Sequence, residues 1–275
     1  MDFIIKTYID FLTSLKSQNY SFQTFQEFLK CPAKKTIILR HDVDKLPENS
    51  FRFAQIQHEL GIKGSYYFRI VSESFNPKII EKIVKLGHEI GYHYEDVDLV
   101  NKSSKLTERD IINHAIKLFD KHLQELRKFF PVNTICMHGS PLSKYDNKLL
   151  WKYYNYKDFG IIGEPYFDIN FSRVLYLTDT GRKWNGEKVS IRDKVYKSNV
   201  LSSPVIKRGE STRYFHGFKK THDIISAAEK GKLPNQIMFT FHPQRWTDKS
   251  LPWIQELIWQ NTKNMVKYFL NKLRN

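Results

Sequence analysis

The sequence has little cysteine, no long apolar run and no apparent export signal. Its two cysteines among 275 residues, Cys31 and Cys136, do not have a metal-binding or redox spacing. No apolar stretch approaches the roughly 18 residues that a membrane-spanning helix needs. The first residues, Met1-Asp2-Phe3-Ile4-Ile5-Lys6, lack the basic region and the cleavage site of a signal peptide, and are expected to be helical. Together these absences favour a reducing, cytoplasmic location.

Acidic residues are scarce compared with basic ones. The chain has 44 Lys and Arg against 29 Asp and Glu, which gives a net charge of +15. Such a charge attracts polyanions, including nucleic acid, phosphate-bearing lipids and nucleotide-linked substrates. The basic residues are spread along the chain without a Lys/Arg block or a nucleic-acid-binding motif. We therefore expect a solvated basic surface and no specific nucleic-acid partner, with peripheral contact to a membrane as a further interpretation.

Strand and helix patterns alternate along the chain, which predicts a parallel sheet with helical crossovers. The chain is 41% hydrophobic, enough for one sizeable core, and shows no linker or internal repeat. A glycine-rich phosphate loop is missing after the first strand, so a closed or nearly closed barrel fits better than an open doubly wound sheet. The expected strands are 36–41, 64–69, 89–94, 134–138, 159–162, 174–177 and 236–241.

The regions outside the expected barrel have their own patterns. Residues 1–34 are expected to form an N-terminal helical segment packed on a barrel of residues 35–275. Residues 183–218 are irregular and basic, and their length is typical of a functional loop. The last helix, about 251–272, carries Trp253 and Trp259, which we expect to pack in the core.

Side chains with ligand or proton-transfer chemistry follow several expected strands. The first strand ends in His41-Asp42-Val43-Asp44, and its two carboxylates leave the same face. In a parallel barrel, such residues meet at the carboxyl ends of the strands. The residues at these ends are Asp42, Asp44, His93, Glu95, His138, Asp179, Arg182 and His242.

Asp and His together suit a borderline divalent cation. Zinc is the expected ion, with nickel, cobalt or manganese as alternatives. Such an ion polarises a carbonyl and lowers the pKa of water. A nearby carboxylate then takes a proton from the water, and a histidine protonates the leaving amine. The set therefore predicts hydrolysis of an amide or an ester.

Three segments in their order resemble the polysaccharide deacetylase (NodB-like, carbohydrate esterase 4) superfamily. They are Leu39-Arg40-His41-Asp42-Val43-Asp44, Gly87-His88-Glu89-Ile90-Gly91-Tyr92-His93 and Phe239-Thr240-Phe241-His242-Pro243. The resemblance covers about residues 35–245 and implies a distorted (β/α)7 barrel. Two further segments are His-Gly-Ser-Pro-Leu-Ser from residue 138 and Thr-Asp-Thr-Gly-Arg-Lys-Trp from residue 178. Together with the first three segments, they are similar to the WbmS-type branch of this superfamily, which is linked to bacterial surface-polysaccharide synthesis.

The resemblance implies roles for four of these residues. Asp42 matches the catalytic base and Asp44 a metal ligand, although the intervening Val43 leaves the reverse assignment open. His93 matches the first of two family histidines four residues apart, but Val97 occupies the second position. His242 matches the acid that protonates the leaving group.

The remaining assignments rest on placement along the chain. Glu95 is preferred over His138 as the third ligand because it follows His93 by two residues on an extended strand end. His88 lies at the other end of that strand and is expected to be structural. Arg182 is expected to pair with Asp42 and lower its pKa. The motif residues His138, Ser140 and Trp184 are expected to contact the substrate.

The sequence thus predicts a metal-dependent hydrolase that removes an N-acyl group from an amino sugar in bacterial surface-polysaccharide biosynthesis. The expected acyl group is acetyl. The sugar would belong to a glycan, a nucleotide-sugar or a lipid-linked saccharide. Deformylation of an N-formyl sugar is a chemically similar alternative. A non-catalytic barrel that binds glycans or polyanions is the other, and the missing second histidine supports it. Retention of Asp42, His93 and His242 opposes it.

Overall fold

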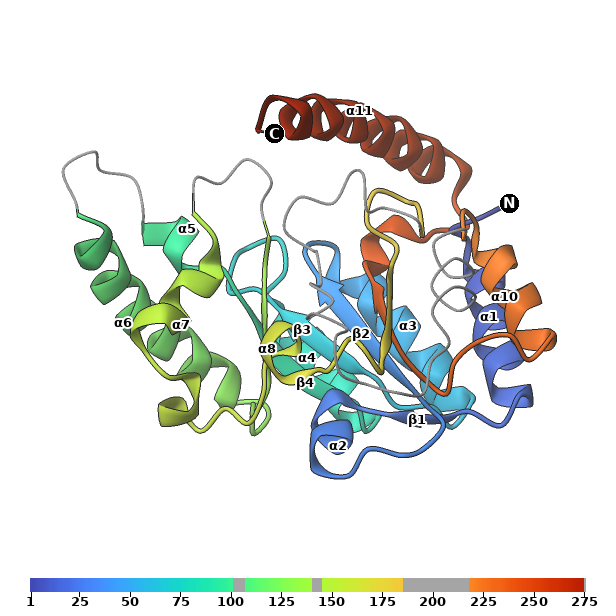
Figure 1. Cartoon of the computed structure of the whole chain (residues 1–275), viewed down its shortest axis with the longest axis horizontal. Helices are drawn as coiled ribbons and strands as arrows, with labels where there is room; N and C mark the ends of the chain where they lie inside the picture. Colours follow the sequence, from blue (N-terminus) through green and yellow to red (C-terminus); the bar gives the residue numbers. More distant parts are fainter. Residues whose placement is uncertain (101–106, 140–144, 185–217, 275) are drawn as a thin grey trace.

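The computed structural model describes residues 1–100, 107–139, 145–184 and 218–274. The protein is a single-domain α/β structure built on one curled parallel sheet (Figure 1). The strand order is β5-β4-β3-β2-β7-β6, with β1 also paired to β2. The strands are β1 Ser21–Gln23, β2 Thr36–Val43, β3 Ser65–Phe68, β4 Glu89–Tyr94, β5 Ile135–Met137, β6 Leu175–Thr178 and β7 Gln236–Phe241. Since all pairs are parallel, their carboxyl ends lie at one end of the molecule.

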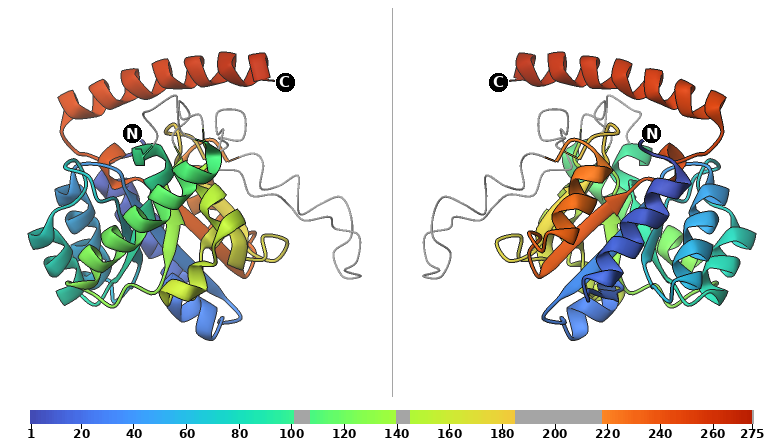
Figure 2. Two further views of the ribbon diagram at one scale, coloured as in Figure 1. Left: turned by 90° about the vertical axis from the view of Figure 1, so that its left-hand side faces the viewer. Right: turned by 90° about the vertical axis from the view of Figure 1, so that its right-hand side faces the viewer.

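Helices connect these strands and cover the outer face of the sheet. The longer ones are α1 Ile5–Ser17, α3 Pro47–Glu59, α4 Pro77–Lys85, α6 Glu108–Arg127 and α10 Thr221–Glu229. Short helices fill the connections: α2 Phe25–Lys30, α5 Asp96–Val100, η1 Asn147–Leu149, α7 Leu150–Tyr153, η2 Tyr156–Phe159, α8 Pro165–Asp168 and η4 Pro243–Arg245. The last helix, α11 Ser250–Arg274, crosses one end of the molecule apart from the others (Figures 1 and 2). No helix in the described ranges is both long enough and apolar enough to cross a membrane.

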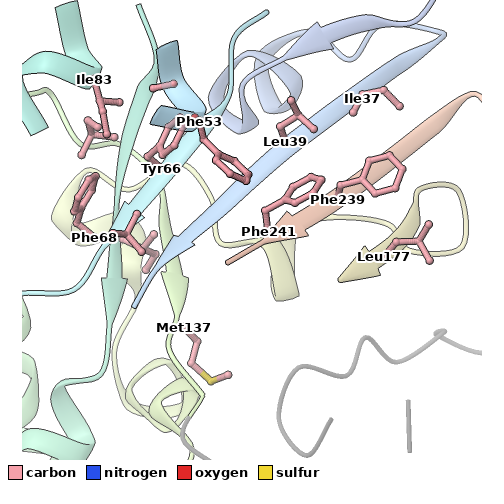
Figure 3. Packing of buried hydrophobic residues seen from close by; sticks show 14 of the residues in the cluster. Ile37, Leu39, Phe53, Tyr66, Phe68, Ile83, Met137, Leu177, Phe239 and Phe241 are labelled. Atoms are coloured by element: carbon pink, nitrogen blue, oxygen red, sulfur yellow. The ribbon is translucent and has the colours of Figure 1, made fainter. Parts of the chain in front are cut away.

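Alternation along the strands separates two cores. Ile37 and Leu39 of β2 face the outer helices together with Phe239 and Phe241 of β7 (Figure 3). Ile38, between them, faces the hollow of the sheet. The cluster in this hollow comprises Phe25, Phe28, Ile38, Tyr67, Cys136, Ile169, Val174 and Met238. The inward positions further along β2 are Arg40 and Asp42, so the hollow changes from apolar to charged toward the carboxyl end.

The structure differs from two local predictions about the strands. The segment expected to be helical at residues 1–34 contains α1 and α2 and, between them, the strand β1, which pairs with the beginning of β2 through Ser21 and Thr36. The strand expected at 159–162 is replaced by η2 and an irregular segment, because Gly160 adopts a left-handed conformation with φ of +70° and ends the helical turn. Among the described residues, an isolated bridge between Thr134 and Gly163 is all that continues the sheet beyond β5.

A buried carboxylate completes this irregular edge. Glu164 accepts a hydrogen bond from the Met137 backbone N–H of β5 at 3.1 Å and another from the Tyr166 N–H of α8 at 2.6 Å. It therefore satisfies a backbone amide of the edge strand β5 and, as the N-cap of α8, an amide in the first turn of that helix. Burial is the main influence on this carboxyl group and raises its pKa from 4.5 to about 7.

This raised pKa predicts a pH-dependent contribution to stability. A carboxyl group whose folded-state pKa is raised stabilises the fold fully below its ordinary pKa of 4.5 and loses that contribution as pH rises through about 7. Compared with a Glu164→Gln variant, the wild-type free energy of unfolding should therefore fall by up to about 1.4 kcal/mol per pH unit in this window. Urea unfolding at about pH 5 and about pH 8 measures it. Glu59→Gln, at an exposed site of α3, is the control, and parallel pH profiles for all three proteins would contradict the prediction.

Candidate active site

Three side chains from different parts of the sheet converge at the carboxyl end. Oδ1 of Asp44, just after β2, lies 3.6 Å from Nε2 of His93 and 3.7 Å from Nε2 of His138. This Oδ1 is buried and has no hydrogen-bond donor. Two atoms bound to zinc at about 2.1 Å in a tetrahedral site lie about 3.4 Å apart, close to both distances. The residues therefore fit a divalent cation, which would neutralise the unpaired carboxylate oxygen.

The two imidazoles are held with the same nitrogen toward Asp44. Nδ1 of His93 lies 2.9 Å from the Cys136 carbonyl oxygen, to which it donates as Nδ1–H. Nδ1 of His138 lies 2.8 Å from Oε2 of Glu95. The N–H of His93 directed at a carbonyl leaves its Nε2 with a lone pair, the form that binds a metal. His138 is held on its far side by the close approach of the Glu95 carboxylate to Nδ1.

Glu95, the third ligand expected from the sequence, does not join this group. Arg69 donates to both its oxygens, from Nε at 2.7 Å and from Nη2 at 2.9 Å. Burial opposes its charge, but His138 and Arg69 outweigh burial and lower the pKa of Glu95 to about 2. His138, which the sequence ranked second, completes the triad of candidate ligands with Asp44 and His93. The prediction that Glu95 is the third ligand considered only the alternation of side chains along the strand. It did not include the ion pair with Arg69, which engages both oxygens of Glu95.

Asp42 is paired within its own strand. Nε and Nη2 of Arg40 donate to its two oxygens at 2.8 and 2.6 Å, and both side chains are buried. Burial would raise the pKa of Asp42, but foremost the charge of Arg40 lowers it overall. The expected pairing with Arg182 is therefore wrong. The Arg182 guanidinium instead donates to the Trp253 carbonyl oxygen and lies over the Phe3 ring.

One of the expected substrate contacts, Trp184, lies away from the candidate site. Trp184 is buried among the outer helices, where its indole N–H donates to Thr221 at 2.9 Å and its ring lies against Phe239. Its apolar surface is used for packing, and the prediction that it binds substrate is wrong. Ser140, and the expected basic loop apart from its ends, lie outside the described residues. Of the two that the structure describes, His138 is at the candidate site and Trp184 is not.

A third histidine, His242, faces the triad from just after β7 and is held by a carboxylate. Nε2 of His242 lies 4.0 Å from Oδ2 of Asp44, while its Nδ1 lies 2.5 Å from Oδ1 of Asp179. Asp179 is fully buried and also accepts hydrogen bonds from Arg245 and from the Trp246 indole. Burial raises the pKa of this carboxyl group, but His242 and Arg245 lower it overall. The position of Asp179 after the expected strand at 174–177 predicted that it lies near the site, but the sequence did not predict its pairing with His242.

Neither the family models nor the curated proteins include a match to this chain. Among solved structures, it is similar to a CE4 family pseudoenzyme from Bacillus anthracis, with 16% identity, a TM-score of 0.41 and coverage of 86% of this chain and 62% of that one. It is also similar to PdaA of Bacillus subtilis, a family 4 carbohydrate esterase, with 14% identity, a TM-score of 0.39 and coverage of 92% and 83%. The chain thus spans less than two thirds of the first of these structures.

The Arg40–Asp42 pair predicts a strong coupling in stability. Arg40→Met leaves a buried carboxylate without its cation and should lower the free energy of unfolding by about 3–5 kcal/mol at neutral pH. Adding Asp42→Asn should recover part of this loss, because the unpaired charge is then removed. Urea unfolding of the two single variants and the double variant gives the coupling energy.

A surface pair supplies the control for this cycle. Arg52 lies 3.5 Å from Asp248 and is 60% exposed, so Arg52→Met should cost at most about 1 kcal/mol. An Arg40→Met variant no less stable than Arg52→Met would show that Asp42 does not need this guanidinium.

Proposed function

We propose that the protein is a metal-dependent hydrolase that removes an N-acyl group from an amino sugar. The observation that carries this proposal is the Asp44–His93–His138 triad, with Asp42 on one side and His242 on the other. Zinc is the proposed ion because two imidazoles and one carboxylate are a ligand set that it favours in catalytic sites. When bound, such an ion polarises the acyl carbonyl and lowers the pKa of a water molecule.

Asp42 is proposed as the base. Its Oδ2 lies 3.8 Å from Nε2 of His93, at the edge of the triad and outside it. Arg40 holds both oxygens in place and keeps the carboxylate ionised, while each oxygen retains a lone pair for a further proton. The water that attacks the acyl carbon would give its proton to Asp42. The placement of Asp44 among the two imidazoles supports this order of roles over the reverse one.

His242 is proposed as the acid. Asp179 accepts Nδ1–H and stabilises the positive charge of the imidazolium, so Nε2–H is directed toward the triad. As the bond between the acyl carbon and the sugar nitrogen breaks, this proton would pass to the nitrogen. The products are a carboxylate and a free amine. Asp179 acts through His242 as a positioning residue.

The acyl group and the carrier of the sugar are finer parts of the proposal. Acetyl is proposed, with formyl as the alternative, because both amides need the same base and acid. The net charge of +15 favours a substrate that carries phosphate, such as a nucleotide-sugar or a lipid-linked saccharide. These features, and the similarity of the motifs to the WbmS-type branch, support a role in bacterial surface-polysaccharide biosynthesis in the cytoplasm.

A non-catalytic glycan-binding barrel is less well supported. Its main argument was Val97, which stands where the family pattern has a second histidine. Val97 is buried in the outer core, and His138 on the next strand brings a second imidazole to Asp44 instead. A binding module also has no need of the paired His242 and Asp179.

The proposed ligands predict graded losses of zinc affinity. His93→Ala and His138→Ala each remove a ligand and should abolish stoichiometric binding. Glu95→Gln keeps all three ligands but weakens the orientation of His138, and should reduce affinity by about 10- to 100-fold. Isothermal titration with zinc measures this, with His58→Ala, at an exposed site in α3, as the control. Loss of binding in Glu95→Gln with retention in His138→Ala would reverse the assignment.

Variants of the two proposed proton-transfer residues should lose turnover, whereas variants of the proposed ligands should lose zinc. Asp42→Asn should keep zinc and lose turnover, while His242→Ala should cost on the order of 10²–10⁴-fold in kcat. Acetate or formate release from N-acetyl and N-formyl amino sugars, free or linked to a nucleotide or a lipid, provides the assay. If Asp42→Asn loses zinc instead, Asp42 and Asp44 exchange roles. Zinc-loaded wild-type protein that binds a glycan without releasing acid would favour the binding barrel.

A further inference from the structure

The last helix, α11, lies on the body of the protein with its polar side inward. Gln260 and Asn264 on this side are each 6% exposed. The Asn264 side chain donates to the Gly181 carbonyl oxygen at 2.9 Å, and the Trp253 carbonyl oxygen accepts from Arg182. These hydrogen bonds, together with the Arg182 guanidinium over the Trp253 ring, join the inward side of α11 to the described part of the body. An ordinary surface helix instead covers the core with its apolar side.

The opposite side of α11 carries most of the exposed apolar residues of this helix, interspersed with the exposed polar residues Gln255, Asn261 and Thr262. Its residues recur at spacings of three, four and seven, which places them on one face of the helix. Trp259, which the sequence pattern placed in the core, lies at the border of this face and is 51% exposed. The face comprises Leu251 (74% exposed), Ile254 (47%), Ile258 (62%) and Met265 (59%), with Trp259 and Val266 beside them. A row of this kind on a folded protein marks an interaction surface.

We propose that this outer face of α11 binds the surface of an anionic lipid membrane. Helices that lie in a membrane interface combine an exposed apolar face with basic residues, and many are 20–30 residues long. The 25 residues of α11 include Lys263, Lys267, Lys272 and Arg274 against one acidic residue, Glu256. No described helix is apolar enough to cross a membrane, so α11 would lie along the surface.

Charge favours a lipid surface over a second copy of the chain. Two copies that each carry +15 repel one another, whereas an anionic bilayer attracts each copy, by about 1 kcal/mol for each basic residue near it. The apolar side chains would then enter the region between headgroups and acyl chains. The apolar and electrostatic contributions both favour the anionic membrane, whereas they oppose each other for a second copy of the chain.

The helix lies at the same end of the molecule as the candidate active site (Figures 1 and 2). Its Glu256 is 3.8 Å from Lys45, the residue after Asp44, and its Asn264 contacts the turn that begins at Asp179. A membrane bound to the outer face would therefore lie beyond α11, at the carboxyl end of the sheet. The proposal does not depend on catalysis, because it concerns the binding of the helix alone.

Co-sedimentation with vesicles tests the proposal. The probes are vesicles of phosphatidylcholine with phosphatidylglycerol in equal parts, and vesicles of phosphatidylcholine alone. Full-length wild-type protein should bind the mixed vesicles and bind the neutral ones far more weakly. Ile254→Gln/Ile258→Gln should weaken binding to the mixed vesicles by at least about tenfold, since two exposed side chains lose their apolar contact with lipid.

A control pair of substitutions away from α11 shows whether the loss of vesicle binding is specific to the outer face of this helix. Ile9→Gln/Ile162→Gln alters two isoleucines that are 37% and 40% exposed elsewhere, and should leave vesicle binding within about twofold. Wild-type protein that stays in the supernatant, or equal losses in both double variants, would overturn the proposal. So would a wild-type dimer by light scattering that Ile254→Gln/Ile258→Gln converts to a monomer, which would assign the face to a second copy. These readouts need neither zinc nor turnover, so their failure leaves the proposed hydrolase untouched.

Discussion

The ion pair between Arg40 and Asp42 is the constraint on which the site depends. A carboxylate buried in the hollow of a sheet needs a compensating cation or hydrogen bonds to stay ionised, and Asp42 obtains a cation from the same face of its own strand, two residues earlier. Both partners are fixed by the backbone of β2, which also pairs with β3 and β7. The pair therefore keeps an ionised carboxylate at a defined height in the hollow, next to the position where Asp44 and the two imidazoles meet.

The three histidines of the site are likewise fixed by a contact to the ring nitrogen that faces away from the site. The Cys136 carbonyl oxygen orients His93, Glu95 with Arg69 orients His138, and Asp179 orients His242. Each of these partners is a strongly buried or bonded group on a neighbouring element. The histidines thus present Nε2 to one small region, which is what metal binding and proton transfer to a substrate both require.

The proposed activity and the proposed membrane contact meet at one end of the molecule. The parallel sheet places the candidate ligands there, and α11 crosses the same end with its apolar face outward. A strongly basic chain bound to an anionic surface in this way would hold its site near lipid headgroups. Such a position suits a sugar carried on a lipid, and it gives a physical reason for combining an inverted amphipathic helix with a hydrolase site.

The sequence by itself determined the parallel α/β class and most of the strands, because hydrophobic periodicity is a local property that a buried sheet must satisfy. It also placed Asp42, Asp44, His93 and His242 at the site, since the carboxyl ends of parallel strands converge whatever the details of packing. Tertiary structure alone decided which groups pair. Arg40 rather than Arg182 neutralises Asp42, His138 rather than Glu95 completes the triad, and Trp184 packs in the outer core while Trp259 is exposed. These choices depend on distances of a few ångströms between segments far apart in the chain, and neither spacing nor strand parity encodes them.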